Sequence, residues 1–363
     1  MTLLEASSPV VAEPVAPARR RSGLTVLGLA VLWLGYVLAH ELLSGRVWWM
    51  LLPDLAPPFV FALIPALLLG GAAIVRGRHG GRAALLAVVA FALTAGQSGL
   101  RLPALGSPGP VPAGAIRVVS WNTQFWEQDE DPQAFYRYLR SYDADVYLLQ
   151  EYLYFTDGPI RIDRLAEVRQ WFPGYQIVAD SELLTLSRLP IRDSRPLAAV
   201  DDAAPPPAGT DFLSYWTTKT LRTDIEVGGG VISFYNVHTP VQLDAERSPL
   251  TTRFYTVVQD QAARREASWR ALTTDLDGNP GPVFVAGDFN STPAMGELDR
   301  IRLDEAALTG GGLYPSTWDA RGRGWWRLDH VFTSDDVAVH RYDLHDSLDL
   351  SDHRAQDLRI SLT

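Results

Sequence analysis

A short uncharged strand that ends in polar residues constrains the fold of this chain more than any other stretch. Val283–Gly287 carries no charge, which is typical of a strand that is buried on both faces of a sheet. Because side chains alternate along an extended chain, Asp288 and Asn290 are expected on one face and Phe289 in the core. Residues 291–293 (STP) then predict the start of a helix. By themselves, the Asp288 carboxylate and the Asn290 amide fit either a simple turn or a site that binds a metal ion or a water.

Short strands and helices alternate from residue 115 to the end of the chain, which predicts an α/β domain over residues 115–363. Apolar runs at 116–121, 144–149, 183–187 and 231–237 predict buried strands. Amphipathic stretches at 131–141, 162–171 and 254–276 predict helices. Further strands are expected at 175–179, 191–199 and 212–221, and a loop over 203–209.

Polar side chains mark the ends of the buried strands. A carboxylate, an amide or an imidazole at one strand end is weak evidence, but several of them together predict one oxygen-rich cleft. The set comprises Asn122, Glu151, Asn236 with His238, Asp288 with Asn290, Asp329 with His330 after Trp325-Trp326, and Ser351-Asp352-His353 after Leu348–Leu350.

The types of side chain in this set select the chemistry. Carboxylate and amide oxygens without cysteine suit Mg²⁺, with Mn²⁺ as the alternative, while His238 and His353 leave zinc open. A hard ion beside two histidines is what the attack of water on a phosphate ester requires. The chain contains neither a glycine-rich phosphate loop followed by lysine nor a GxSxG motif, which disfavours a kinase, an ATPase and a serine hydrolase.

The order of the motifs from Ile116 to Leu362 resembles the endonuclease/exonuclease/phosphatase superfamily. The matching segments are SWNTQ, LLQEY, NVH, GDFN, RLDHVF and SDH. The resemblance implies a four-layered α/β sandwich, in which two mixed β-sheets pack face to face and the site lies at one edge.

The resemblance also implies a role for each matched residue. The metal ligands would be Glu151, Asn122 and Asp352, and Asp288 would orient or deprotonate the attacking water. Asn290 would contact the transition state, His238 and His353 would bind the phosphate, and Asp329 would keep His353 protonated.

The chain departs from the family pattern in two places. No acidic partner for His238 is identified in the sequence, and Gln124 occupies the position of the usual second Asn or Asp of the first motif. Asn236, Arg264 and Arg265 are candidates for contact with the substrate, although a solvated face is the alternative for both arginines.

The first hundred residues predict a membrane region. Residues 1–22 are expected to be a disordered cytoplasmic tail, residues 23–101 to hold three transmembrane helices at about 23–43, 55–75 and 83–100, and residues 102–114 to be a Pro/Gly linker. Arginines lie before the first predicted span (Arg19–Arg21) and between the second and third, whereas only Arg46 follows the first span. The positive-inside rule therefore predicts a multi-pass protein of the cell membrane with residues 115–363 outside the cytoplasm.

Charge and location together select the substrate. Residues 1–112 carry a net charge of +4 (eight Arg, four acidic), so the remainder carries 24 basic and 38 acidic residues, a net −14. Nucleic-acid binding normally requires a basic surface, so nucleic acid is disfavoured as a partner. The layout resembles the VanJ-type membrane phosphatases of actinomycetes, which implies a lipid-linked phosphate such as undecaprenyl diphosphate. The alternatives are an extracellular nuclease, a sphingomyelinase-like or phosphoinositide phosphodiesterase, and an inactive module that binds lipid phosphate; no protein partner is implied.

Overall fold

The computed structural model of the chain describes residues 17–101, 109–199, 205–244, 247–310, 312–319 and 322–363. Two compact units divide these residues. The helical unit comprises the described part of residues 1–41 together with residues 60–95. The sandwich unit comprises residues 42–59, called here the inter-helix segment, and the described part of residues 96–363.

Three helices form the helical unit: α1 (Pro17–Leu43, whose last two residues belong to the sandwich unit), α2 (Val60–Val75) and α3 (Gly77–Thr94). They pack through small and aliphatic side chains, because alanines such as Ala30 on α1 and Ala87 on α3 let the helices approach closely. The Thr94 hydroxyl, near the end of α3, donates a hydrogen bond to Ala90 O at 2.9 Å.

The expectation of three transmembrane helices is wrong. Among the described residues, Arg21–Leu43 is the one helix that is long and apolar enough to cross a membrane. A second span exists only if Trp48–Leu55 and Val60–Val75, which are bent by 64° to each other, count as one. Helix α3 fails because Gly77–Arg82 puts two arginines, a histidine and three glycines into its first turns. Helix α1 also begins at Pro17, inside the predicted tail; residues 1–16 and 102–108 of the tail and linker lie outside the described residues.

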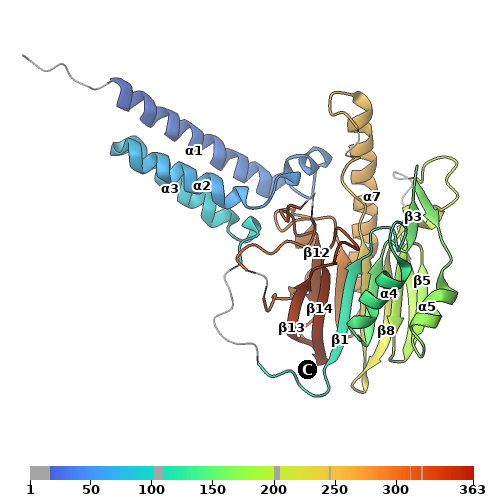
Figure 1. Ribbon diagram of the computed structural model, residues 1–363. Helices are drawn as coiled ribbons and strands as arrows, with labels where there is room; N and C mark the ends of the chain where they lie inside the picture. Colours follow the sequence, from blue (N-terminus) through green and yellow to red (C-terminus); the bar gives the residue numbers. More distant parts are fainter. Residues whose placement is uncertain (1–16, 102–108, 200–204, 245–246, 311, 320–321) are drawn as a thin grey trace, which may run out of the picture. The chain divides into compact units, whose positions relative to one another are not determined.

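Two six-stranded mixed sheets build the sandwich unit (Figure 1). The first has the order β13-β14-β1-β2-β6-β5, in which β1 and β2 are parallel and the other pairs antiparallel. Its strands are β1 (Ile116–Asn122), β2 (Val146–Gln150), β5 (Gln176–Asp180), β6 (Leu183–Ser187), β13 (Val337–His345) and β14 (Ala355–Leu362).

The second sheet has the order β11-β12-β10-β9-β8-β7, with β9 and β10 parallel. Its strands are β7 (Ile191–Ala198), β8 (Thr218–Val227), β9 (Gly230–His238), β10 (Val283–Asp288), β11 (Asp304–Glu305) and β12 (Asp329–Thr333). A separate hairpin joins β3 (Leu153–Phe155) to β4 (Pro159–Arg161).

The two sheets pack face to face, as the alternation of buried residues on their strands requires. Val118 and Leu148 of the first sheet share one core with Phe234 and Phe284 of the second. On the outer face of the first sheet lie α4 (Pro132–Ser141) and α5 (Leu165–Trp171).

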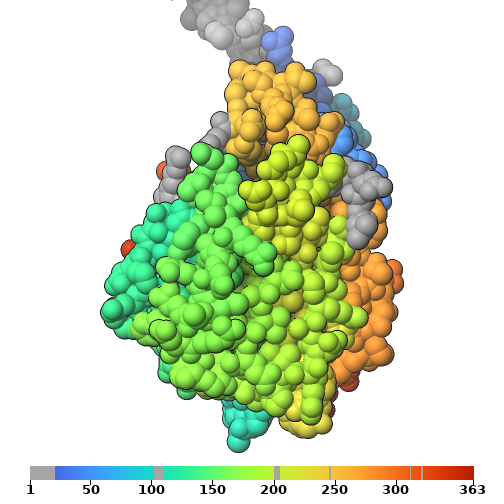
Figure 2. Space-filling view, turned by 90° about the vertical axis from the view of Figure 1, so that its right-hand side faces the viewer, coloured from blue at the N-terminus to red at the C-terminus, as the bar shows by residue number. Residues whose placement is uncertain are grey.

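Helix α7 (Thr252–Asp277) covers the second sheet through Trp269 and Leu272. The expected four layers are therefore present. The face nearest β5 and α5 is covered by the green and yellow-green segments, with the orange segment that contains α7 above them (Figure 2).

Most of the predicted strands and helices form, and the exceptions have local causes. The predicted strand at 212–221 is divided into α6 (Leu213–Thr217) and the start of β8. No helix starts at residues 291–293, because Ser291 Oγ donates to Phe289 O at 3.0 Å and Ser291 O accepts from His330. Asp329 and His353 do not end strands: Asp329 begins β12, and His353 precedes β14.

Candidate active site

The ends of five strands, two in the first sheet and three in the second, bring the predicted polar residues to one edge of the sandwich. The parallel strands β9 and β10 end together, so that His238 lies opposite Asp288. The antiparallel neighbour β12 begins where β10 ends, which places Asp329 opposite Asp288 on the other side. In the first sheet β1 ends at Asn122, and its antiparallel neighbour β14 begins just after His353. The parallel strands thus supply site residues from their ends, and their antiparallel neighbours supply site residues from their starts.

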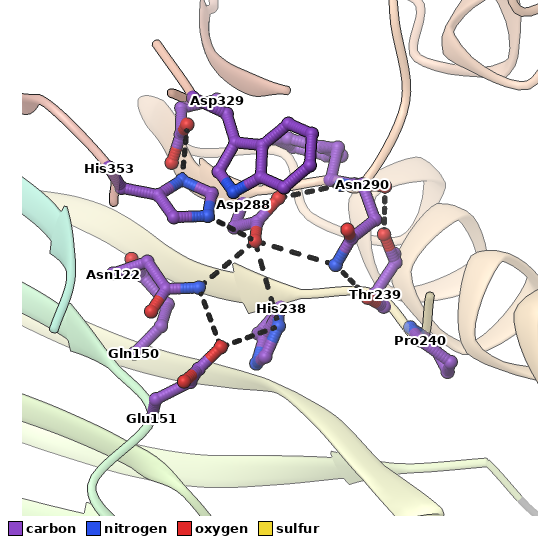
Figure 3. Close-up of polar contacts among 12 residues, drawn as sticks. Asn122, Gln150, Glu151, His238, Thr239, Pro240, Asp288, Asn290, Asp329 and His353 are labelled. Carbon is purple, nitrogen blue, oxygen red and sulfur yellow. Dashed lines mark hydrogen bonds and ion pairs between the residues drawn. The ribbon is translucent and has the colours of Figure 1, made fainter. Parts of the chain in front are cut away.

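Asp288 Oδ2 is the centre of the cluster (Figure 3). It accepts a hydrogen bond from Asn122 Nδ2 at 3.0 Å, and the same amide donates to Glu151 Oε1 at 2.9 Å. The Nε2 atoms of His238 and His353 each lie 3.6 Å from Asp288 Oδ2. Two carboxylates, one amide and two imidazoles therefore meet around a single carboxylate oxygen.

Two site residues have backbone conformations that are rare outside glycine. Glu151 has φ 62° and Asn290 has φ 46°, so the extended geometry predicted beyond Asp288 does not persist. The Glu151 carboxylate is fixed by Phe125 N, which donates to Oε2 at 3.0 Å. Asn290 N donates to Asp288 Oδ1 at 2.7 Å, while its side-chain amide donates to Thr239 O at 2.9 Å. Both side chains are thereby aimed at the cluster before any substrate arrives.

His353 forms a dyad with Asp329, as the resemblance implies. Its Nδ1 lies 2.8 Å from Asp329 Oδ2, and both side chains are buried. Burial alone would lower the pKa of His353, but the carboxylates of Asp329 and Asp288 outweigh it and hold that pKa well above its usual range. His353 therefore presents a protonated Nε2 to the cluster.

Glu182 is the acidic partner of His238 that the sequence does not reveal. It lies in the turn before β6, is fully buried, and places Oε2 3.1 Å from His238 Nδ1. Lys219 on β8 binds its other oxygen. Burial would lower the pKa of His238, but Glu182 and then Asp288 raise it. The only sequence signal for Glu182 is that an acidic residue directly precedes a buried apolar strand, and many turns share this pattern.

The remaining carboxylates suit a divalent cation. Burial raises the pKa of both Glu151 and Asp288, and no described lysine or arginine pairs with either. A hard cation would relieve this concentration of negative charge, and carboxylate oxygens are ligands that Mg²⁺ accepts. Ligand atoms of Asp288, Asp329 and His353 also lie within 4.8 Å of one another, but Asp329 and His353 already bind each other. Asp288 Oδ2 faces the Nε2 atoms of both imidazoles, so Glu151 is the carboxylate of the cluster that is left for a metal.

Asp352 reaches the rim of the same site. Its Oδ2 accepts from Trp318 Nε1 at 2.8 Å, and its backbone N–H donates to Gln124 Oε1 at 2.8 Å. Its Oδ1 lies 3.9 Å from His353 Nε2. Gln124 therefore helps to orient Asp352.

Three predicted substrate-binding residues lie outside the cluster. Asn236 is fully buried between the sheets, where its amide accepts from Gln150 Nε2 at 2.6 Å and donates to Leu149 O at 3.0 Å. Arg265 is fully buried in an ion pair with Glu297, and Ser291 Oγ accepts from its guanidinium at 2.7 Å. Arg264 stacks on Trp216, with its guanidinium carbon 4.9 Å from the ring centroid. None of the three lines the site cavity.

A cavity of about 450 Å³ opens from the polar cluster. Its polar end holds Glu151, Asp288, Asn290, Asp352 and His353. The rest of the wall is mostly apolar, with Gln124, Gln242 and Thr292 between the apolar side chains of Leu55, Phe125, Val241, Leu243, Met295, Trp318, Trp326 and Leu328.

Comparison with known proteins gives one family match and several similar structures. Residues 119–353 match the sequence model of the Endonuclease/Exonuclease/phosphatase family. Among solved structures, an endonuclease/exonuclease/phosphatase from Bacteroides vulgatus is similar at 16% identity and TM-score 0.47, covering 69% of this chain and 99% of its own. The corresponding values are 17%, 0.46, 68% and 72% for a protein from Beutenbergia cavernae. They are 18%, 0.44, 70% and 97% for the human Nocturnin catalytic domain with bound sulfate. No curated protein gives a significant match.

Proposed function

Because the chain belongs to the endonuclease/exonuclease/phosphatase family, whose members hydrolyse phosphoester bonds, we propose that it hydrolyses a lipid-linked phosphate or diphosphate. The family match spans residues 119–353 and so includes every residue of the cluster around Asp288. The reaction class rests on this match, and the lipid substrate rests on the cavity.

The composition of the cavity wall carries the choice of substrate. Among the described residues that line it, none is a lysine or an arginine, and His353 is the one basic side chain. A nucleic-acid backbone is normally held by several such cations, because they replace its counterions. Eight apolar side chains beside the polar cluster suit instead a phosphate attached to a hydrocarbon. Undecaprenyl diphosphate is the substrate that we propose.

The residues of the cluster fit the hydrolysis of a phosphate ester. Asp288, whose pKa is raised by burial, accepts the proton of the attacking water at Oδ2. His353 and His238 donate from Nε2 to oxygens of the phosphate, on which negative charge grows in the transition state. The Asn290 amide donates to Thr239 O at 2.9 Å and more weakly to Asp288 Oδ2 at 3.4 Å, and this second N–H would turn to the transition state. Asp329 and Glu182 hold the two imidazoles and their protons in place.

A divalent cation would complete this site. Glu151 and Asn122 would hold it, with Asp352 at the rim, and we propose Mg²⁺, with Mn²⁺ as the alternative. When bound, such an ion neutralises phosphate charge.

We also propose that α1 anchors the enzyme in the cell membrane. Arg21–Leu43 is apolar enough to span it, and Arg19–Arg21 stand at the N-terminal end of that stretch. The positive-inside rule then keeps the N-terminus in the cytoplasm, and one crossing delivers the sandwich unit to the outside.

One assay separates the candidate substrates. The full chain, purified in detergent with Mg²⁺, is offered undecaprenyl diphosphate, sphingomyelin, a phosphoinositide and plasmid DNA, and Asp288→Asn serves as a matched inactive control. We expect phosphate release from undecaprenyl diphosphate that the control lacks. Cleavage of DNA alone would refute the lipid substrate. Binding of the lipid without turnover, equal in both proteins, would instead identify a binding module.

A further inference from the structure

The inter-helix segment, residues 42–59, is built into the sandwich unit although it lies between two apolar helices in the sequence. Gly296 N donates to Ser44 Oγ at 3.0 Å, and Ser44 Oγ donates to Asp54 Oδ2 at 2.7 Å. At its other end Trp326 Nε1 donates to Leu55 O at 3.0 Å. The segment is thus fixed at both ends by residues far along the chain.

Two glycines allow the backbone of the segment to meet the loop after β10. Gly45 has φ +69°, and a Cβ atom there would lie 2.6 Å from Gly296 C. A Cβ atom on Gly296 would in turn lie 2.7 Å from Ser44 O. Neither position accepts a side chain without moving backbone, so this contact depends on glycine from both sides.

The segment also has a hydrophobic contact with α7. Leu51 is buried against Phe254 and Val258 in the first turns of α7, with Trp48 and Leu243 packed around them. This contact and the hydrogen bonds leave Leu55 at the wall of the cavity that holds Asp288. Leu55, Trp326, Leu243 and the neighbouring apolar side chains form one continuous wall, which begins at the polar cluster.

We propose that the inter-helix segment is a specificity element of the active site, and that Leu55 and Trp326 hold the hydrocarbon chain of the substrate. This inference rests on the proposed function and names the part of the chain that recognises the lipid. The cavity wall indicates what the site binds. A phosphate bound at Asp288 has one covalent substituent. In the described part of this cavity, the only wall that this substituent meets beyond the polar end is largely apolar. The segment that supplies Leu55 is joined at Leu43 to the apolar stretch of α1.

A chain-length series tests the inference. The full chain in detergent with Mg²⁺ is assayed for phosphate release from isopentenyl, geranyl, farnesyl and undecaprenyl diphosphate. We expect kcat/KM to rise with chain length in the wild type. In Leu55→Ser the ratio of kcat/KM for farnesyl to that for isopentenyl diphosphate should fall about tenfold, the equivalent of one lost leucine contact.

Two further variants separate a change in specificity from damage to the fold. Leu250→Ser makes the same chemical change at a side chain that is 94% exposed and does not line the cavity, so the ratio should stay at the wild-type value. Trp326→Phe keeps an aromatic ring but removes the donor to Leu55 O, so the ratio should fall in the same direction as in Leu55→Ser.

The outcomes separate this inference from the proposed function. Turnover of all four diphosphates without a preference for chain length would overturn the inference and leave the proposed function standing. An equal loss for every substrate in Leu55→Ser would assign the segment a structural role and overturn the inference. Turnover of none of them would overturn both.

Discussion

Glu182 gives the sharpest test of how this site is built. Its carboxylate is fully buried between His238 Nδ1, 3.1 Å away, and the ammonium of Lys219, which is only 3% exposed. Substitution Glu182→Gln keeps the shape of the side chain and removes its charge. It leaves a buried Lys219 ammonium without its counter-ion, and breaking a buried pair in this way costs about 3–5 kcal/mol.

The stability change should appear in thermal unfolding of the full chain in detergent. A loss of about 3–5 kcal/mol corresponds to a Tm lower by roughly 10 °C in a domain of this size. The double variant Glu182→Gln/Lys219→Met removes both charges, so most of the lost stability should return. Recovery is expected because Lys219 Nζ faces the Tyr215 ring, 3.7 Å from its centroid, and an apolar methionine fits that environment.

In the same variants, activity should change independently of stability. His238 loses the carboxylate that outweighs its burial, so its pKa falls. The raised pKa extends the pH range over which the imidazolium is present, and activity that depends on it is lost as pH rises through that pKa. In Glu182→Gln this loss should begin at a lower pH, with kcat/KM at neutral pH lower by about 100-fold.

The double variant should stay as impaired as Glu182→Gln, whereas Lys219→Met alone should keep the wild-type pH profile. If the double variant recovered its activity together with its stability, Glu182 would act only through Lys219. The assignment of Glu182 as the partner of His238 would then be refuted.

Three further outcomes follow from the cited contacts. In Asp329→Asn, His353 loses the acceptor that holds its proton, so kcat should fall by about 100-fold or more, and the loss of a buried pair should also lower the Tm; unchanged kcat would remove the dyad from the mechanism. Glu151→Gln should weaken the rise in Tm that Mg²⁺ produces in the wild type, and an equal rise in both proteins would place the ion elsewhere. The pKa of Glu305 is lowered to about 2, chiefly by His330 and Arg327 against the effect of burial, so its stabilising effect is full above its unfolded pKa of about 4.3 and disappears as pH falls through about 2. Chemical unfolding of Glu305→Gln should therefore differ from that of the wild type at neutral pH and coincide with it near pH 2.

Local pattern was enough to predict most strands and the main residues of the site. The run Val283–Gly287 could be read as a buried strand because it lacks any charge, and β10 spans Val283–Asp288. Asp288, Glu151 and His238 could be predicted because each follows such a strand directly, and strand ends meet at a sheet edge. Asp329 and His353 enter the prediction only through the order of motifs, since Asp329 begins β12 and His353 precedes β14, so neither ends a strand.

Residues that depend on tertiary contacts could not be predicted in this way. Glu182 precedes β6 in one sheet and meets His238 at the end of β9 in the other, and no spacing in the sequence encodes that distance. The inter-helix segment was assigned to the membrane region by composition alone. Its place in the sandwich unit depends on Gly45 and Gly296, which are about 250 residues apart and show no pattern until the two backbones meet.

Asn236 makes contacts between the two sheets that its position in the sequence does not reveal. It stands two residues before His238 and was expected to contact the substrate, yet its amide spans the two sheets. It accepts from Gln150 Nε2 at 2.6 Å and donates to Leu184 O at 3.2 Å. Gln150 directly precedes Glu151, so this bridge couples the Glu151 carboxylate beside the first sheet to His238 of the second. A site divided between two sheets needs such a link, because packing of apolar side chains alone tolerates small shifts that catalysis does not. Asn236 therefore contributes by fixing the distance between the two halves of the site.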